Sequence, residues 1–153
     1  MKKLLSILMG IGLILILVGC SSEKTATFTQ KAGTTEFILV YTYDKKNDTV
    51  TKFKVEMKSS TENTRSRKEN EKLSGEIKKD GVVVSVTEKD GKLISTVEID
   101  LTKYKLSEIK ESNNAILAGL LQSGFLIEDG DHVSFSKSKE VALKRGMTEQ
   151  TKK

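Results

Sequence analysis

Residues 49–58 constrain the fold most strongly, because from Thr51 onward their side chains alternate strictly between two kinds. The segment reads TVTKFKVEMK, with threonine or apolar side chains at the odd positions and charged side chains at positions 52, 54, 56 and 58. A repeat of two residues is that of a β-strand, whereas a helix repeats every three to four residues. Since the charged face must meet water, the pattern predicts a half-buried strand in an antiparallel sheet.

Further strand signals lie on both sides of this segment. Residues 35–43 carry apolar side chains on both faces, which predicts a central strand, and the polar residues 45–48 predict a hairpin loop after it. Residues 82–86 and 93–101 flank Lys89-Asp90-Gly91, whose glycine accepts the positive φ of a two-residue turn. Together with a weaker candidate strand before them, these segments predict an antiparallel sheet of about five strands built from hairpins.

Three other segments carry apolar residues at helical spacing. Residues 61–79 are polar apart from two apolar residues one turn apart, which predicts a solvated helix. Apolar stripes near residues 117 and 142 predict two more helices. The serines expected to cap them are Ser107 or Ser112 for the first and Ser136 or Ser138 for the second. The predicted fold class is α+β, an antiparallel β-sheet of about five strands with helices packed on one face.

The first 22 residues, MKKLLSILMGIGLILILVGCSS, form a separate unit. Two lysines precede an apolar stretch of about 15 residues, and Leu17-Val18-Gly19-Cys20 follows it directly. These four residues resemble the lipobox of bacterial lipoproteins. The resemblance implies that a diacylglyceryl group is attached to the Cys20 sulfur and that the signal is cut between Gly19 and Cys20. The alternative is an uncleaved transmembrane helix, but the apolar stretch is shorter than the roughly 20 residues that span a bilayer.

We therefore predict three parts: a lipoprotein signal peptide over residues 1–19, the lipidated cysteine and a short tether over residues 20–25, and a single α+β domain over residues 26–153. Cys20 is the only cysteine, so its acylation leaves no thiol for a disulfide or for catalysis. Membrane lipid, reached through acyl chains such as palmitate on Cys20, is the first predicted partner. The predicted location is the cell membrane, with the domain lipid-anchored on the extracytoplasmic face.

The charge of the chain bears on its other partners. The whole chain carries a formal +5, and removal of residues 1–19, which hold two lysines and no acid, leaves +3. The basic residues are interleaved with acids rather than clustered, which argues against nucleic-acid binding. A mild positive charge instead suits anionic headgroups or an envelope polymer close to the membrane. We expect an envelope polymer or a membrane protein as a further partner, and no nucleic acid.

Side chains able to carry chemistry are few. His132, with Asp129 and Asp131, could ligate a divalent metal, but the segment lacks the spaced oxygen ligands of an EF-hand loop, so neither a metal nor a cofactor is predicted. A Ser-His-Asp triad would need His132, the only histidine, as its base, and no serine lies in a nucleophile elbow. Glu98 and Asp100 share a strand face and could act as an acid–base pair, yet their neighbours favour a solvated sheet surface. No catalytic residue and no enzyme activity are predicted.

Two runs, GVVVSVTEKDGKLISTVEIDLTKY over residues 81–104 and VSFSKSKEVALKRGM over residues 133–147, resemble the small YehR-like lipoproteins of bacteria. The resemblance implies lipid anchoring and this fold, but it supplies no site, because the family has no established activity. We predict a non-enzymatic cell-envelope binding or accessory module that uses an exposed face or edge of its sheet. The alternatives are a small-solute or metal-binding lipoprotein that assists a transporter, with a pocket lined by Tyr41, Tyr43 and Phe53, and, ranked last, an envelope hydrolase.

Overall fold

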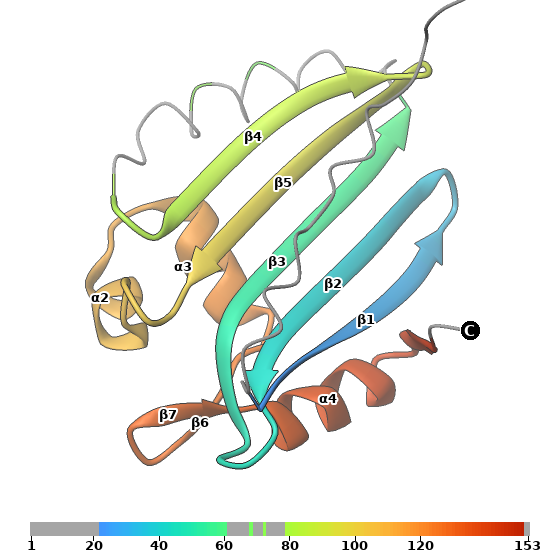
Figure 1. Ribbon diagram of the computed structural model, residues 1–153. Helices are drawn as coiled ribbons and strands as arrows, with labels where there is room; N and C mark the ends of the chain where they lie inside the picture. The colour runs from blue at the N-terminus through green and yellow to red at the C-terminus, as the bar shows by residue number, and fades with distance from the viewer. Residues whose placement is uncertain (1–21, 61–67, 69–71, 73–78, 152–153) are drawn as a thin grey trace, which may run out of the picture.

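The computed structural model describes residues 22–60, 68, 72 and 79–151. The elements in chain order are β1 (Glu23–Ala32), β2 (Thr35–Asp44), β3 (Thr49–Ser60), β4 (Val82–Lys89), β5 (Lys92–Asp100), α2 (Leu106–Glu111), α3 (Ala115–Gln122), β6 (Ile127–Asp129), β7 (His132–Ser134), α4 (Phe135–Lys144) and β8 (Thr148–Gln150). Six strands run side by side in the order β4-β5-β3-β2-β1-β8, and the β6–β7 hairpin joins the sheet where Ser134 pairs with Thr49 of β3. Figure 1 shows the long strands β1 to β5 as one twisted sheet.

The long hairpins form where the alternation and the turn residues place them. Asp90 and Gly91 have φ values of 53° and 69°, as the two-residue turn between β4 and β5 requires. Phe53 of β3 lies opposite Tyr41 of β2 and Ile99 of β5, so the apolar residues of these three strands share one face. The prediction of a central strand is confirmed, since β2 lies between β1 and β3.

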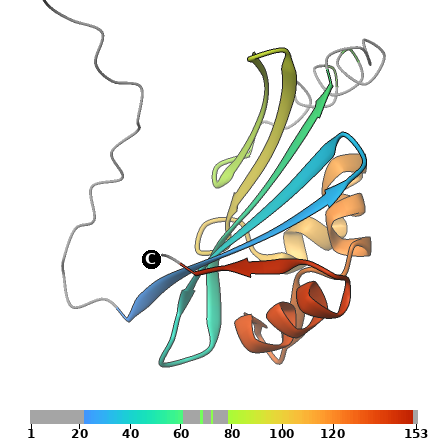
Figure 2. The same cartoon turned by 90° about the vertical axis from the view of Figure 1, so that its right-hand side faces the viewer.

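The helices α2, α3 and α4 pack against the same face of the sheet, as Figure 2 shows. The core lies between the two layers, and its most deeply buried side chains come from both: Phe28, Leu39, Tyr41, Phe53, Ile99, Ile109 and Leu117. Each apolar side chain of this size stabilises the fold by about 1.5–3 kcal/mol when it leaves water. The α+β prediction is therefore correct in outline, although the sheet dominates and the helices are short.

The size of the sheet and the start of α3 differ from the expectation. The sheet has eight strands rather than about five, because β6, β7 and β8 add three residues each. Asn114 caps α3, accepting hydrogen bonds from the N–H groups of Ile116 and Leu117 at 2.9 and 3.3 Å. The predicted caps were wrong because Ser107 lies inside α2 and Ser112 ends that helix.

The last helix also begins earlier than expected. Its cap is Ser134, whose Oγ accepts a hydrogen bond from the Lys137 N–H at 3.2 Å, and not Ser136 or Ser138. Ser138 is instead fully buried, and its Oγ accepts a hydrogen bond from the Ile127 N–H at 3.0 Å. This bond ties α4 to β6.

Two predicted features fall outside the described residues. One is the N-terminal signal with Gly19 and Cys20, and the other is nearly all of the helix predicted over residues 61–79, of which Lys68 and Lys72 are described and are helical. Within the part of the chain that is described, no helix is both long and apolar enough to cross a bilayer.

Candidate functional site

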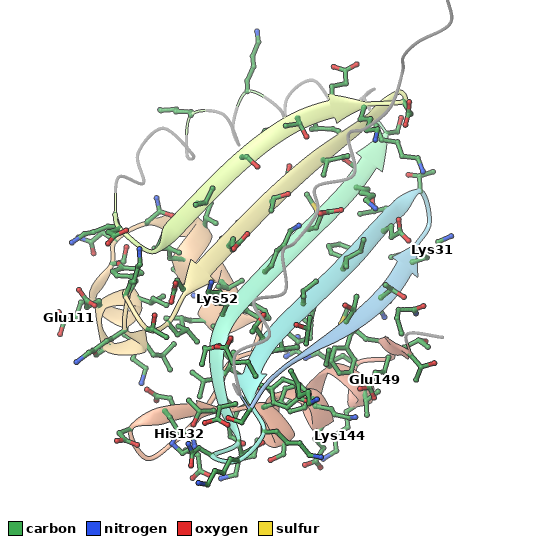
Figure 3. The ribbon with its side chains drawn as sticks, viewed as in Figure 1. Lys31, Lys52, Glu111, His132, Lys144 and Glu149 are labelled. Atoms are coloured by element: carbon green, nitrogen blue, oxygen red, sulfur yellow. The ribbon has the colours of Figure 1, made fainter. Side chains whose placement is uncertain are left out.

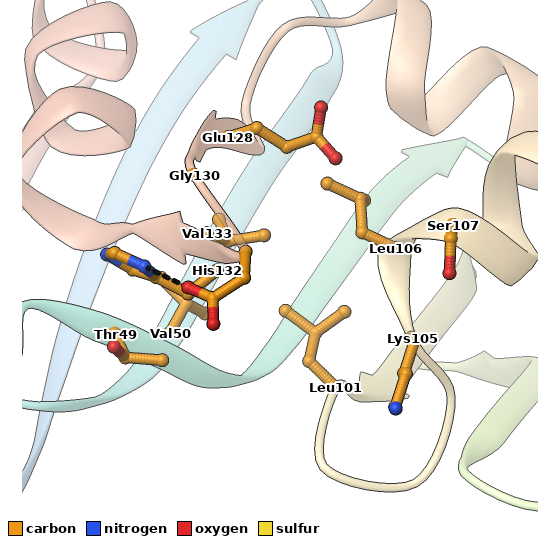
Figure 4. A pocket seen from close by; sticks show the side chains of 11 residues that line it. Thr49, Val50, Leu101, Lys105, Leu106, Ser107, Glu128, Gly130, His132 and Val133 are labelled. Atoms are coloured by element: carbon orange, nitrogen blue, oxygen red, sulfur yellow. Dashed lines mark hydrogen bonds and ion pairs between the residues drawn. The ribbon is translucent and has the colours of Figure 1, made fainter.

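A cavity of about 480 Å³ opens between the β6–β7 hairpin, the start of β3 and the turn that leads into α2 (Figure 4). We call it the hairpin cavity. Its floor is apolar and is formed by Val50, Leu101, Leu106 and Val133. Its rim is polar and is formed by Thr49, Lys105, Ser107, Glu128, Gly130, Asp131 and His132. Sites for small molecules commonly combine an apolar lining with a few polar groups in volumes of about 300–1,000 Å³.

Asp48 fixes the strand that forms one wall of the hairpin cavity. It ends the loop between β2 and β3 with a φ of 52°, a conformation that aspartate tolerates better than most residues. Its carboxylate accepts hydrogen bonds from the Ser134 hydroxyl at 2.6 Å and from the hydroxyl and N–H of Ser136 at 2.7 and 2.9 Å. Partial burial works to raise the pKa of the Asp48 carboxyl, but these hydrogen bonds outweigh it and hold the pKa below its usual value. This Asp48 clamp joins the start of β3 to the junction of β7 and α4.

The charged groups on the rim are unequally paired. Glu128 forms an ion pair with Lys110 of α2, and the Asp131 Oδ1 lies 3.3 Å from the His132 Nδ1, the contact dashed in Figure 4. The Lys105 ammonium has no ion-pair partner among the described residues. An apolar floor with an uncompensated lysine at its rim suits a small molecule that has an apolar body and an anionic group.

A second hollow, of about 260 Å³, lies on the helix-facing side of the sheet beside α3. We call it the α3 groove. Its lining is mostly apolar and includes Phe37, Val55, Met57, Val84, Val97, Ile116, Leu120 and Phe125. The layer between sheet and helices therefore contains unfilled space, as the hypothesis of a small-solute pocket required. The residues that line this space are not the ones expected.

The three aromatic residues expected to line that pocket lie in the filled core. Tyr41 and Phe53 are buried with ring centroids 4.9 Å apart, and Tyr43 stacks on Phe135 at 3.6 Å. The Tyr41 hydroxyl donates a hydrogen bond to the Phe125 carbonyl at 2.8 Å, and burial raises the pKa of this hydroxyl far above its usual range. None of the three lines the hairpin cavity or the α3 groove, so this placement of the pocket was wrong.

The residues considered as metal ligands have separate neighbours. The Asp129 carboxylate pairs with the Lys137 ammonium at 2.9 Å, while the exposed Asp131 lies against His132 in the turn of the hairpin. Within the described ranges, no three histidine, cysteine, aspartate or glutamate side chains come together in a way that could hold a metal ion.

Glu98 and Asp100 lie on the open face of the sheet and not in a cleft. Asp100 accepts a hydrogen bond from the Thr102 N–H at 3.0 Å and lies 4.0 Å from the Lys52 ammonium. Partial burial works to raise the pKa of the Asp100 carboxyl, but the contacts with Thr102 and Lys52 lower it overall. Neither carboxylate lines the hairpin cavity or the α3 groove, so the structure places this pair on a solvated surface.

The lysines of β3 share that open face, from which Figure 3 shows Lys52 projecting. The Lys54 ammonium lies 3.2 Å from the Glu56 carboxylate, and the Lys58 ammonium lies 3.3 Å from Glu56 and 3.7 Å from Glu36. The positive charge of the row is therefore largely compensated. Attraction of an anionic polymer to this face is correspondingly weak.

Sequence reasoning found the His132 side of the hairpin cavity and missed the opposite side. Lys105 and Leu106 begin a helix of only six residues, which is too short for a periodic signal. Asp48 was recognised only as a loop residue, because its partners lie 86 and 88 positions away in the sequence. The one local signal for a special role of Asp48 was its position directly before a predicted strand.

These features place the chain in the class of small α+β domains with one open sheet face and hollows on the other. No known family model matches the chain. An uncharacterized lipoprotein of Listeria innocua is 28% identical to it over 150 residues, which cover 92% of this chain and 97% of the relative. The name of that relative states no activity.

Two solved structures share the fold. The YehR protein of Escherichia coli has a TM-score of 0.56 at 20% identity and matches over 86% of this chain and 93% of its own. A protein from Streptococcus pneumoniae has a TM-score of 0.62 at 15% identity and matches over 98% of both chains. At these identities the likeness concerns the fold alone. With the lipoprotein relative, it confirms the predicted resemblance to small YehR-like lipoproteins of unknown function.

Proposed function

We propose that the chain is a bacterial lipoprotein that is acylated on Cys20 after cleavage between Gly19 and Cys20, and that its domain lies on the extracytoplasmic face of the cell membrane. The lipobox supports this proposal, and so does the lipoprotein relative of nearly the same length. Cys20→Ala should abolish incorporation of a labelled fatty acid and leave the precursor uncut. Ser21→Ala is the matched control and should keep the label. Undiminished labelling of Cys20→Ala would contradict the proposal.

We further propose that the domain is a non-enzymatic binding or accessory module of the cell envelope. The hairpin cavity is the observation that carries this proposal. Its floor is apolar, and both acids of its rim, Glu128 and Asp131, already have basic neighbours. A general acid or base must exchange a proton with its substrate, so side chains engaged in this way suit recognition better than bond-making chemistry.

Photo-crosslinking in intact cells tests this function. A photoreactive residue at Ser107, on the rim of the hairpin cavity, should form a defined adduct, whereas one at the exposed Thr87 of β4 should not. Leu106→Trp, which narrows the cavity, should suppress the adduct at Ser107. The same adduct at both positions, or an adduct that persists when the cavity is narrowed, would count against the cavity as the binding site.

A small-solute lipoprotein that assists a transporter is the second candidate. The volume of the hairpin cavity favours it, and so does Lys105 on the rim, which has no ion-pair partner among the side chains that the structure describes. In the crosslinking experiment it predicts an adduct with the mass of a small molecule, and the first candidate predicts a macromolecule. The metal-binding version has no ligand set among the described side chains. The hydrolase stays last, because no serine hydroxyl in the described part is hydrogen-bonded to His132.

A further inference from the structure

The start of β1 is fixed against the loop between β2 and β3. The Ser22 carbonyl accepts a hydrogen bond from the Lys45 N–H at 3.1 Å, and the Ser22 hydroxyl is bonded to the Asp44 carboxylate. The first described residue is therefore already part of the folded domain. Only Ser21 separates it from Cys20.

This short connection determines which end of the domain faces the membrane. Two residues of fully extended chain span about 7 Å, which is less than the Debye length of about 8 Å at physiological ionic strength. Figures 1 and 2 place the start of β1 and the β2–β3 loop at the same end of the sheet. Figure 3 places His132, on the rim of the hairpin cavity, at that end and Lys31 at the other. An acylated Cys20 thus holds the loop end of the domain at the level of the lipid headgroups.

This end carries three exposed lysines, Lys24, Lys45 and Lys46, which we call the anchor-side lysines. None of them has an ion-pair partner in the part of the chain that the structure describes. Among the acidic side chains at the same end, Glu23, Asp44 and Asp48 each accept hydrogen bonds from neighbouring residues of the domain. In the β6–β7 hairpin, Asp129 pairs with Lys137 and Asp131 lies against His132. The acids are therefore engaged within the protein, whereas the long lysine side chains can extend toward a surface.

We propose that the anchor-side lysines dock the domain onto anionic phospholipid headgroups and so fix its orientation on the membrane. The proposal rests on the acylation of Cys20. The attraction of a lysine to an anionic membrane surface strengthens docking about fivefold for each side chain. The hairpin cavity, which begins at Thr49 directly after the loop, is then held beside the bilayer.

The test uses the full chain, purified from bacterial membranes and reconstituted into vesicles of phosphatidylcholine with or without phosphatidylglycerol. Asn47→Cys places a fluorophore in the loop, and Thr34→Cys places one in the exposed turn at the opposite end of the sheet. Headgroup spin-labelled lipid should quench the fluorophore at position 47 more than the one at position 34. This difference should be larger in the anionic than in the neutral vesicles, and at 1 M salt, where the Debye length is about 3 Å, it should fall to the value found in the neutral vesicles.

Substitution of the anchor-side lysines by glutamine should weaken docking about 100-fold, which corresponds to fivefold for each of three lysines. The matched control replaces Lys31, Lys89 and Lys92, which are exposed near the far ends of the hairpins, and should leave the quenching unchanged. Equal quenching at positions 47 and 34, or equal quenching in neutral and anionic vesicles, would overturn the docking. Flotation with vesicles tests the anchor separately: chains that fail to float would refute acylation. Chains that float but show no stronger quenching at position 47 in anionic than in neutral vesicles would refute docking alone.

Discussion

Replacement of Asp48 measures how strongly the β2–β3 loop is tied to the rest of the domain. Asp48→Ala removes three hydrogen bonds to the carboxylate, one from Ser134 at 2.6 Å and two from Ser136 at 2.7 and 2.9 Å. A hydrogen bond to a charged group contributes about 1.5–3 kcal/mol, but three bonds to one carboxylate are not additive. We expect their loss to lower the free energy of unfolding by about 2–3 kcal/mol. Alanine at a φ of 52° adds about 1 kcal/mol.

Two further variants separate these contributions. Asp48→Gly loses the same hydrogen bonds without the backbone strain, so it should be about 1 kcal/mol more stable than Asp48→Ala. Asparagine tolerates this backbone conformation and keeps one acceptor oxygen. Asp48→Asn should therefore lower the free energy of unfolding by only about 1 kcal/mol. Urea unfolding of a soluble form that begins at Ser21, followed by far-UV circular dichroism, gives the free energies.

The pH dependence of these differences tests the charge of the clamp. Because the folded pKa of Asp48 is lowered, its stabilisation is fully present above the unfolded pKa of about 3.9 and is lost as the pH falls through the folded value. The difference in free energy of unfolding between the natural chain and Asp48→Asn should therefore narrow as the pH falls below the unfolded pKa of about 3.9. Equal stability of the two at pH 7, or an Asp48→Ala variant no weaker than Asp48→Gly, would refute this reasoning.

The same unfolding assay checks three other substitutions. Gly81→Ala should lower the free energy of unfolding by at least about 2 kcal/mol more than Gly33→Ala. Both glycines have positive φ, but only a Cβ at position 81 would lie 2.8 Å from the Lys103 Cβ. Equal losses for the two variants would exclude this close approach. Tyr41→Phe should lower the free energy of unfolding by about 1–2 kcal/mol, since it leaves a carbonyl without its donor; an unchanged value would show that this hydrogen bond has no net effect. Ser138→Ala should cost a similar amount by leaving a backbone N–H unpaired, and a loss below about 0.5 kcal/mol would contradict that.

The long strands could be predicted because their signals are local. The alternation in residues 49–58 and the turn at Asp90 and Gly91 each need only a few consecutive residues, and the structure confirms both. β8 could not be predicted, since residues 148–150 read TEQ and have no apolar alternation. They form a strand because residues 27–29 of β1, from the opposite end of the chain, offer them an edge to pair with.

The candidate site, like the fold, could be predicted only where its signals are local. The segment around His132 drew attention through its residue types, but the cavity also needs Leu101, Lys105 and Val50, which come from three other segments. The cap of α4 was misplaced because several neighbouring serines could serve, and Ser134 is selected by its non-local contact with Asp48. The cap of α3 is Asn114, which was not among the predicted serines. A local pattern can identify the chemistry of a side chain, but it cannot identify the neighbours that long-range pairing brings to it.

The pairing of β1 with β8 has a consequence for the order in which a newly made chain folds. The Gln150 Nε2 donates a hydrogen bond to the Thr29 Oγ1 at 2.8 Å, across 121 positions of the sequence. In a chain made from its N-terminus, β1 appears early, and its outer edge stays uncovered until residues 148–150 have been made. An uncovered strand edge accepts other extended chains. The interval between the appearance of these two strands is therefore the period in which a newly made molecule is most exposed to mispairing.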